Sequence, residues 1–135
     1  MKSEGLAAEK GLILERSVGY SLRVIKLYRF IEHDDVGRIL GRQLLRSATS
    51  VGANAHEAQG GQSRADFIAK MSVAHKEARE SAYWLRLIQE AELAPGSRLT
   101  DLIEETDQLI RMLSSILLTS KQRANNGRQA SGLHS

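Results

Sequence analysis

Two glutamates one helical turn apart, Glu77 and Glu80, are the residues of this chain best placed to carry out chemistry. They share a stripe with Val73 and Trp84, because spacings of four, three and four put residues on one side of a helix. Two neighbouring carboxylates can act as general acid and base, and with Glu57 they could hold the metal pair found in some helical bundles. A carboxylate enzyme is therefore one hypothesis.

The histidines do not support a metal site. A di-iron bundle of that kind uses Glu-x-x-His on two of its helices. The residues three positions before His33, His56, His75 and His134 are Phe30, Ala53, Ser72 and Ser131. Gly60 and Gly61 follow a predicted helix rather than a strand and lack the lysine of a phosphate-binding loop. We therefore predict no catalytic residue, no metal and no cofactor, and we expect that the protein is not an enzyme.

Basic residues form a second group that could bind a ligand. Residues 16–31 contain four of them and no acid, and residues 36–56 contain three and no acid. Such surfaces attract the phosphates of RNA or DNA, although the aromatic residues that could stack on bases make up only 4% of the chain. The candidate nucleic-acid-binding residues are Arg16, Arg23, Lys26, Arg29, Arg38 and Arg42, to which the C-terminal segment adds Lys121, Arg123 and Arg128.

Length and composition limit the classes of protein that fit. A chain of 135 residues, 41% of them hydrophobic, matches one compact domain. With no cysteine, it offers neither a disulfide nor a thiol nucleophile, so we expect a cytoplasmic protein. No apolar run reaches the ~18 residues of a membrane span, and the N-terminus lacks the pattern of a signal peptide, so no membrane contact is expected. The net charge of +3 allows an anionic partner.

The predicted fold class is all-α, because helix-forming residues dominate and β-branched residues form no alternating runs. A first helix is predicted over residues 12–31, with a core-facing stripe of Leu14, Val18, Leu22, Ile25 and Tyr28. Asp34 and Asp35 should open a second helix over residues 36–58. Its expected inner face is Val36, Leu40, Ser47, Val51, Asn54 and Ala58. The small residues between 47 and 55 would let a neighbouring helix approach closely.

The second half of the chain gives a clearer pattern. Ser63 and Asp66 predict the start of a third helix that should end at Pro95. Its seam is Phe67, Met71, Ala74, Ala78, Ser81, Leu85 and Ile88. A fourth helix over residues 98–123 should bury Leu99, Ile103, Thr106, Ile110, Leu113 and Leu117. These helices predict an up-down-up-down antiparallel four-helix bundle over residues 12–123, between a flexible N-terminus (1–11) and a disordered tail (124–135).

A hairpin of the second and third helices would bring Arg46 next to the two glutamates. We therefore predict an ion pair between Arg46 and Glu77 or Glu80. If that pair is buried, Glu77→Ala should destabilise the fold by roughly 1 to 3 kcal/mol. Asn54 is expected to point into the bundle, where its amide would need hydrogen-bond partners.

The same residues resemble a known family. Residues 46–57 (RSATSVGANAHE), followed by Gly60, Ser63, Asp66 and Phe67, are similar to the signature of the proteins encoded in 23S ribosomal RNA intervening sequences. Residues 70–87 (KMSVAHKEARESAYWLRL) resemble the third helix of that family. The resemblance covers about residues 20–121. The chain departs from it at Ala58, where the family has glycine, and in the loop that follows.

The resemblance implies a left-handed antiparallel bundle that assembles into a ring, a pentamer in known relatives, and it implies no enzymatic activity. A related branch, the accessory proteins of diversity-generating retroelements, forms a basic pentamer that contacts reverse transcriptase and nucleic acid. The motif residues Arg46, Asn54, Glu57, Glu77, Glu80 and Trp84 are interpreted as structural, holding the bundle and its subunit contacts.

Two non-enzymatic hypotheses therefore stand beside the carboxylate enzyme. In the preferred one, the protein is a homo-oligomeric ring that interacts with structured RNA or DNA through the basic residues of its first two helices. In the other, it is an adaptor for a protein encoded nearby, and its basic residues serve only solubility.

Overall fold

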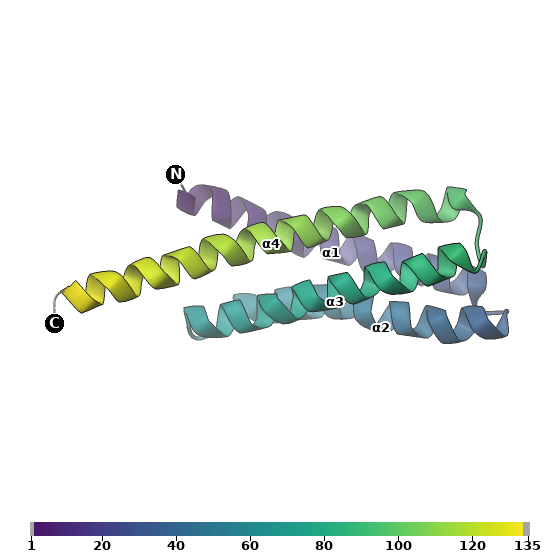
Figure 1. Ribbon diagram of the computed structural model, residues 1–135, viewed down its shortest axis with the longest axis horizontal. Helices are drawn as coiled ribbons and strands as arrows, with labels where there is room; N and C mark the ends of the chain where they lie inside the picture. Colours follow the sequence, from purple (N-terminus) through teal and green to yellow (C-terminus); the bar gives the residue numbers. More distant parts are fainter. Residues whose placement is uncertain (1, 134–135) are drawn as a thin grey trace.

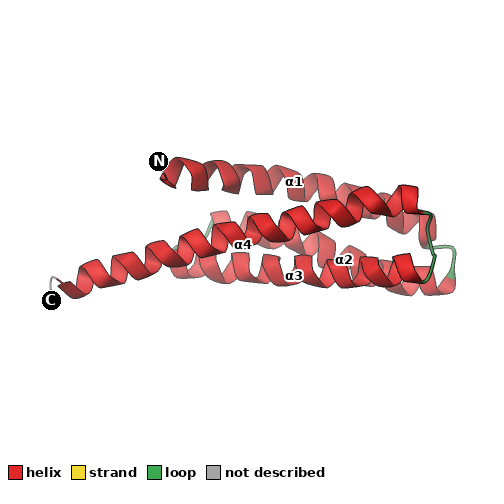
Figure 2. Ribbon diagram, turned by 45° about the horizontal axis from the view of Figure 1, so that its top comes forward, coloured by secondary structure: helices red, strands yellow, loops and turns green. Residues whose placement is uncertain are grey.

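The protein is an all-α antiparallel four-helix bundle, as predicted. The computed structural model describes residues 2–133, and within them the chain forms α1 (Lys2–Ile31), α2 (Asp35–Gln59), α3 (Arg64–Glu90) and α4 (Gly96–Leu133) (Figure 1). Three short connections join the helices (Figure 2). Packing occurs between α1 and α2, α2 and α3, α3 and α4, and α1 and α4. Both chain ends therefore lie at the same end of the bundle as the α2–α3 connection (Figure 1).

Side chains cap the N-termini of α2 and α3 at the positions that the sequence predicts. The Asp34 carboxylate accepts a hydrogen bond from the Gly37 amide at 2.8 Å, and the Ser63 hydroxyl accepts one from the Asp66 amide at 3.1 Å. The end of α3 is different from the prediction. It stops at Glu90, because Glu92 adopts the left-handed conformation (φ 56°) and the Leu93 amide bonds back to the carbonyl of Ile88.

The first and last helices, α1 and α4, are longer than the sequence predicts. α1 begins at Lys2, within the segment expected to be flexible, and its Leu6 is part of the buried core. α4 continues through the expected tail to Leu133, and its last turns project beyond the other three helices (Figure 1). The last two residues, including His134, lie outside the described residues.

The core of the second half follows the sequence pattern closely. Every residue of the seam predicted for α3 is buried. On α4, Leu99, Thr106, Leu113 and Leu117 are buried as predicted, whereas Ile103 and Ile110 are half-buried at the edge of the core. On α2, the predictions are confirmed for Ser47, Val51 and Ala58 but wrong for three others: Val36 is exposed, and Leu40 and Asn54 are only half-buried.

The core face predicted for α1 is wrong. Val18 and Leu22 are exposed, and the rest of the predicted stripe is only half-buried. The helix instead buries a stripe rotated by roughly a third of a turn, Ile13, Ser17, Tyr20, Val24, Leu27 and Ile31. The sequence pattern does not predict this stripe because two of its members, Ser17 and Tyr20, are polar. Ser17 bonds to the carbonyl of Leu14, and the Tyr20 hydroxyl lies 2.7 Å from that of Thr106 on α4, so both are satisfied inside the core.

Glycines let α2 approach α1 closely. A Cβ added at Gly41 would lie 2.8 Å from the Tyr28 ring, and one added at Gly52 would lie 3.0 Å from the Ser17 hydroxyl oxygen. Both positions lie on the buried side of α2. The predicted close approach at the small residues 47–55 is therefore present and involves α1.

Candidate functional site

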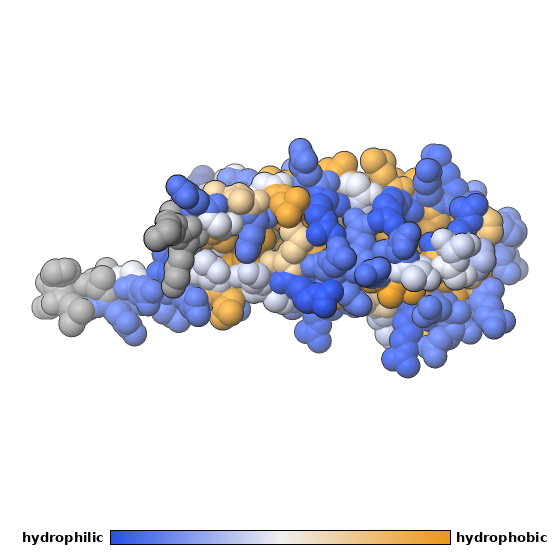
Figure 3. All heavy atoms as spheres, turned by 90° about the horizontal axis from the view of Figure 1, so that it is seen from above, coloured by the Kyte–Doolittle hydropathy of each residue, from blue (hydrophilic) through white to orange (hydrophobic). Residues whose placement is uncertain are grey.

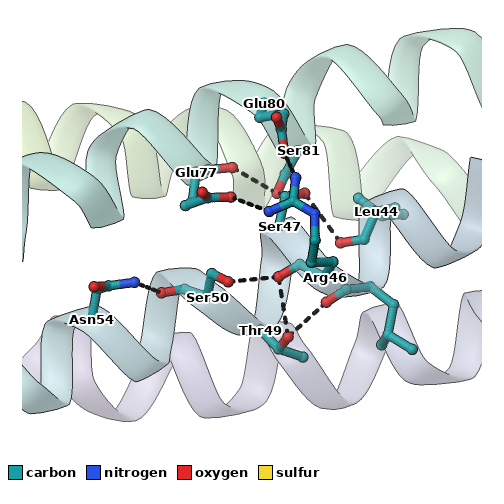
Figure 4. A network of polar contacts seen from close by, with 10 residues as sticks. Leu44, Arg46, Ser47, Thr49, Ser50, Asn54, Glu77, Glu80 and Ser81 are labelled. Carbon is teal, nitrogen blue, oxygen red and sulfur yellow. Dashed lines mark hydrogen bonds and ion pairs between the residues drawn. The ribbon is translucent and has the colours of Figure 1, made fainter.

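Arg46 joins α2 to both glutamates of the α3 stripe. One guanidinium nitrogen lies 3.2 Å from Glu77 Oε2, and the other forms an ion pair with Glu80 (Figure 4). The expected ion pair is thus present, on the outer side of the α2–α3 contact. The Arg46 side chain is 50% exposed, whereas that of Glu77 is only 15% exposed. Both carboxylates therefore already have a cationic partner.

Two serine hydroxyls connect the same helices inside the bundle. The oxygens of Ser47 and Ser81 are 2.8 Å apart and buried (Figure 4). Each hydroxyl can also donate to its own helix, Ser47 to the carbonyl of Leu44 and Ser81 to that of Glu77. The inner and outer polar contacts fix the register of α2 against α3, because each needs its partner at one axial position.

The remaining motif residues do not join this cluster. The Asn54 side chain, predicted to point into the bundle, lies half-buried and donates to the carbonyl of Ser50, one turn earlier on its own helix. Glu57 is exposed and pairs with Lys70 at 3.2 Å. Trp84 packs edge-on against Tyr83, and its buried Nε1 has no hydrogen-bond acceptor among the described residues. Glu57 is therefore not part of a carboxylate site with Glu77 and Glu80.

The described histidines lie elsewhere. His75 Nε2 is 2.8 Å from the Ser114 hydroxyl between α3 and α4, and His56 Nδ1 is 2.8 Å from the carbonyl of Gly52. Burial lowers the pKa of His75, and the positive charges of Arg79 and Lys121 lower it further. Within residues 2–133, no three His, Asp or Glu side chains come together as a metal site requires.

Acids on α4 neutralise part of the basic surface that the sequence suggests. Arg23 forms an ion pair with Glu105, whereas Arg16 donates to the neutral side chain of Gln108 at 2.6 Å and keeps its charge. Asp101 and Glu104 line the same shallow hollow between α1 and α4. Seen from this side, the face is largely hydrophilic, with separate hydrophobic patches (Figure 3). The attraction of α1 for phosphates is therefore weaker than the number of its basic residues suggests.

The other cations predicted on α1 and α2 divide into two groups. Arg38 pairs with Asp35 at 2.8 Å, and Arg42 approaches the Tyr28 hydroxyl at 3.4 Å. Lys26 and Arg29 are exposed on α1 and form no ion pair with any described residue. Arg98, which the charge pattern of the sequence does not indicate, lies over the Phe30 ring and shares a hollow with Lys26. We define the basic edge as Lys26, Arg29, Arg42 and Arg98, which all lie toward the end of the bundle that holds the α1–α2 and α3–α4 connections.

The structure has a second basic site that the charge pattern of the sequence does not predict. Lys10, Arg64 and Arg123 come from three elements and line one hollow at the end of the bundle that holds both chain ends. The up-down topology could have predicted this grouping, because the start of the first helix, the second loop and the end of the fourth helix share that end.

Residues 9–115 match the family described as 23S rRNA-intervening sequence protein. The chain belongs to this family. It is also similar to the crystal structure of a protein of unknown function from the S23 ribosomal protein family of Bacteroides thetaiotaomicron, with 34% sequence identity and a TM-score of 0.76. That similarity covers 81% of this chain and 97% of the other. Among curated proteins, none is significantly similar to the chain.

For this member of the 23S rRNA-intervening sequence protein family, the matched region contains the Arg46 cluster and the basic edge. It ends before the last turns of α4, so Ser120 and Arg123 lie outside it. No helix among the described residues is long and apolar enough to span a membrane.

Proposed function

We propose that this protein is a non-enzymatic, cytoplasmic interaction protein that assembles into a homo-oligomeric ring and presents its basic edge to structured RNA or DNA. A pentamer is the proposed ring size, which rests on the family resemblance. Arg46, Asn54, Glu57, Glu77, Glu80 and Trp84 have structural roles in this proposal. No catalytic step is included, because Arg46 already pairs with both neighbouring carboxylates.

The observation that carries self-assembly is the apolar outer surface of α1. Val18 and Leu22 are 50% and 59% exposed and lie one turn apart, next to the half-buried Leu14 and Ile25. Single exposed apolar residues are common on protein surfaces. Several on one side of a helix form a patch that lowers solubility, and such a patch favours contact with a protein partner. We name this surface, Leu14, Val18, Leu22 and Ile25, the α1 stripe.

A second, different apolar surface favours a ring over a two-fold dimer. Val36 and Ile39 are exposed on α2, and Ile39 shares its helical stripe with Arg46. Trp84 follows Glu77 by two turns on α3, so it lies at the same end of the α2–α3 pair as Ile39. We name Val36, Ile39 and Trp84 the α2–α3 patch. Contact between two unlike surfaces is head-to-tail, and repeated head-to-tail contacts form a ring when the rotation between neighbouring subunits closes.

The basic edge supports the nucleic-acid part of the proposal. Lys26 and Arg29 have no acidic partner among the described residues, and Arg98 lies close to Lys26. A ring would repeat these charges in every subunit, which strengthens binding to a polyanion without any new contact. The alternative, an adaptor that binds a protein and no nucleic acid, predicts a partner whose capture is insensitive to nuclease.

The assembly is tested by sedimentation, at micromolar concentration, of four forms of the protein and of one mixture of two of them. The unchanged protein should sediment as a ring, and Leu22→Glu and Ile39→Glu should each give monomers. A mixture of the two variants should give dimers, because each pair still contains one intact α1 stripe facing one intact α2–α3 patch. Arg111→Glu, which changes an exposed residue of α4, is the control and should keep the ring. A monomeric unchanged protein would overturn the ring.

Binding to nucleic acid is tested by fluorescence anisotropy with labelled structured RNA and duplex DNA at about 50 and 200 mM salt. Affinity that falls steeply with salt supports contact with phosphates. Absence of binding at both concentrations would leave the adaptor as the remaining function.

A further inference from the structure

Three cations line the hollow at the end of the bundle that holds both chain ends. The hollow has a volume of about 240 Å³ and lies between α1, the α2–α3 connection and α4. Lys10, Arg64 and Arg123 line it. No described residue among those lining it is acidic, and these three cations form no ion pair within residues 2–133. Cations repel one another, so an anion bound between them would stabilise the grouping.

The two acids nearest in the sequence do not line the hollow. Glu9 lies beside Lys10 in the chain, but its carboxylate accepts from the Ser115 hydroxyl on α4. Asp66 is exposed on the first turn of α3 and does not line the hollow. The charged side chains of the described residues that line the hollow are therefore all cations.

Lys10 is partly removed from water in this place. Its ammonium lies 4.0 Å from the centre of the Phe67 ring, which is itself buried. Burial lowers the pKa of Lys10, and the charges of Arg123 and Arg64 lower it further. Both effects disfavour the charged form, and a bound anion would offset them.

Ser120 is the feature that distinguishes the hollow from an ordinary basic surface. It is only 3% exposed, it lines the hollow, and its hydroxyl has no hydrogen-bond partner among the described residues. Other buried hydroxyls in these helices bond to the carbonyl one turn earlier, as Thr106 does to Leu102 and Ser81 to Glu77. A buried hydroxyl without a partner is costly, which indicates a missing acceptor.

We propose that this hollow binds a phosphate monoester group, with Arg64, Arg123, Lys10 and Ser120 as its hydrogen-bond donors. A phosphate monoester carries a charge of about −1.5 to −2 near neutral pH and three acceptor oxygens. It therefore matches three cations and one hydroxyl that converge from α1, α3 and α4, whereas a carboxylate has one charge and two oxygens. The site requires neither the α1 stripe, the α2–α3 patch nor the basic edge, so it is independent of the proposed function.

The phosphate group can come from a small free ligand or from the end of a nucleic acid chain. Calorimetry at about 50 mM salt separates them with three probes: inorganic phosphate, a short RNA with a terminal phosphate, and the same RNA with a terminal hydroxyl. Binding of inorganic phosphate with no difference between the RNAs identifies a free ligand. Tighter binding of the phosphorylated RNA identifies a nucleic acid end. If neither difference is seen, with no phosphate binding and equal RNAs, the site is overturned.

Variants locate the binding. Lys10→Gln and Arg123→Gln should each weaken binding of the phosphate-bearing probe by about tenfold or more, because each removes a charged hydrogen bond. Arg111→Gln makes the same change of charge on the exposed side of α4 and should bind as the unchanged protein does. Equal losses in Arg111→Gln and Arg123→Gln would mean a general charge effect and would overturn the site.

Ser120→Ala separates binding from folding. Because its hydroxyl is unpaired in the free protein, this variant should unfold at the same urea concentration or a higher one, while it binds the phosphate-bearing probe more weakly. Unchanged binding in Ser120→Ala would remove the hydroxyl from the site. Arg29→Gln, on the basic edge, should keep phosphate binding, so failure of the proposed RNA contact and failure of this site can be told apart.

Discussion

The Arg46 guanidinium lies 3.2 Å from a Glu77 carboxylate oxygen and so ties the outer side of α2 to α3. On the inner side, Ser47 and Ser81 make the corresponding contact between buried hydroxyls. A half-exposed ion pair and a buried pair of hydroxyls therefore fix the same axial register. The glutamates that first indicate catalysis in the sequence have a positional role in the structure.

Glu77→Ala should have a small effect on stability. The Arg46 side chain is 50% exposed and also pairs with Glu80, so water and the second carboxylate can compensate for the loss. We expect the free energy of unfolding in urea to fall by less than about 1 kcal/mol. Glu80→Ala is the matched comparison and should behave similarly. A loss above about 2 kcal/mol would mean that the ion pair is fully buried in solution, whereas the Arg46 side chain is half-exposed in the single chain.

Two glycine substitutions in helices should have opposite effects. A Cβ at Gly37 would overlap the backbone oxygen of Ile31, so Gly37→Ala must displace the α1–α2 turn and lower the urea midpoint. Gly19 lies inside α1 with no atom within 4 Å of an added Cβ. Gly19→Ala should therefore raise stability by about 0.5 to 1 kcal/mol, because alanine favours the helix. Equal changes in the two variants would contradict this packing.

The contrast between α3 and α1 shows what the sequence can predict. On α3, the small and apolar residues follow one unbroken seam, and all of them are buried. On α1, two apolar stripes compete, and the one that enters the core contains Ser17 and Tyr20. Their burial depends on partners supplied within α1 and by Thr106 of α4, which a single helical pattern does not contain. The stripe that looks more apolar is left on the surface, where it becomes a candidate interface.

The charges illustrate the same limit. The cations of α1 are visible in the sequence, but Glu105, which pairs with Arg23, is 82 positions away and belongs to α4. The grouping of Lys10, Arg64 and Arg123 also depends on elements distant in the chain. Local charge counts therefore identify basic helices, whereas only the packing decides which cations stay free to bind phosphate.

Free and paired arginines should contribute differently to RNA binding. Arg29 forms no ion pair with a described residue, so Arg29→Gln should weaken binding and reduce the slope of log affinity against log salt by about 1. Arg23 is paired with Glu105, and Arg23→Gln should leave that slope nearly unchanged. Both are measured by anisotropy with the same labelled RNA. Equal reductions would show that the α4 acids do not neutralise α1 in solution.

His75 should make the bundle less stable in mild acid. Its imidazole lies between α3 and α4, 2.8 Å from the Ser114 hydroxyl, and faces Arg79 on its own helix and Lys121 on α4. Burial and these two cations lower the pKa of His75 in the folded protein below its ordinary value of 6.5. The unfolded chain therefore takes up the proton first as the pH falls through about 6.5, and unfolding becomes more favourable until the folded protein is protonated too.

Urea unfolding at about pH 7.5 and 5.5 measures this effect. The free energy of unfolding should be lower at the acidic pH, and His75→Gln should lose part of that difference because glutamine does not titrate. His33→Gln, in the exposed α1–α2 turn, is the control and should retain the full difference of the unchanged protein. A bundle that is more stable at the acidic pH, or a difference that survives in His75→Gln and disappears in His33→Gln, would contradict the assignment. The position of His75 between two cations makes the direction of the effect specific, because a carboxylate neighbour would reverse it.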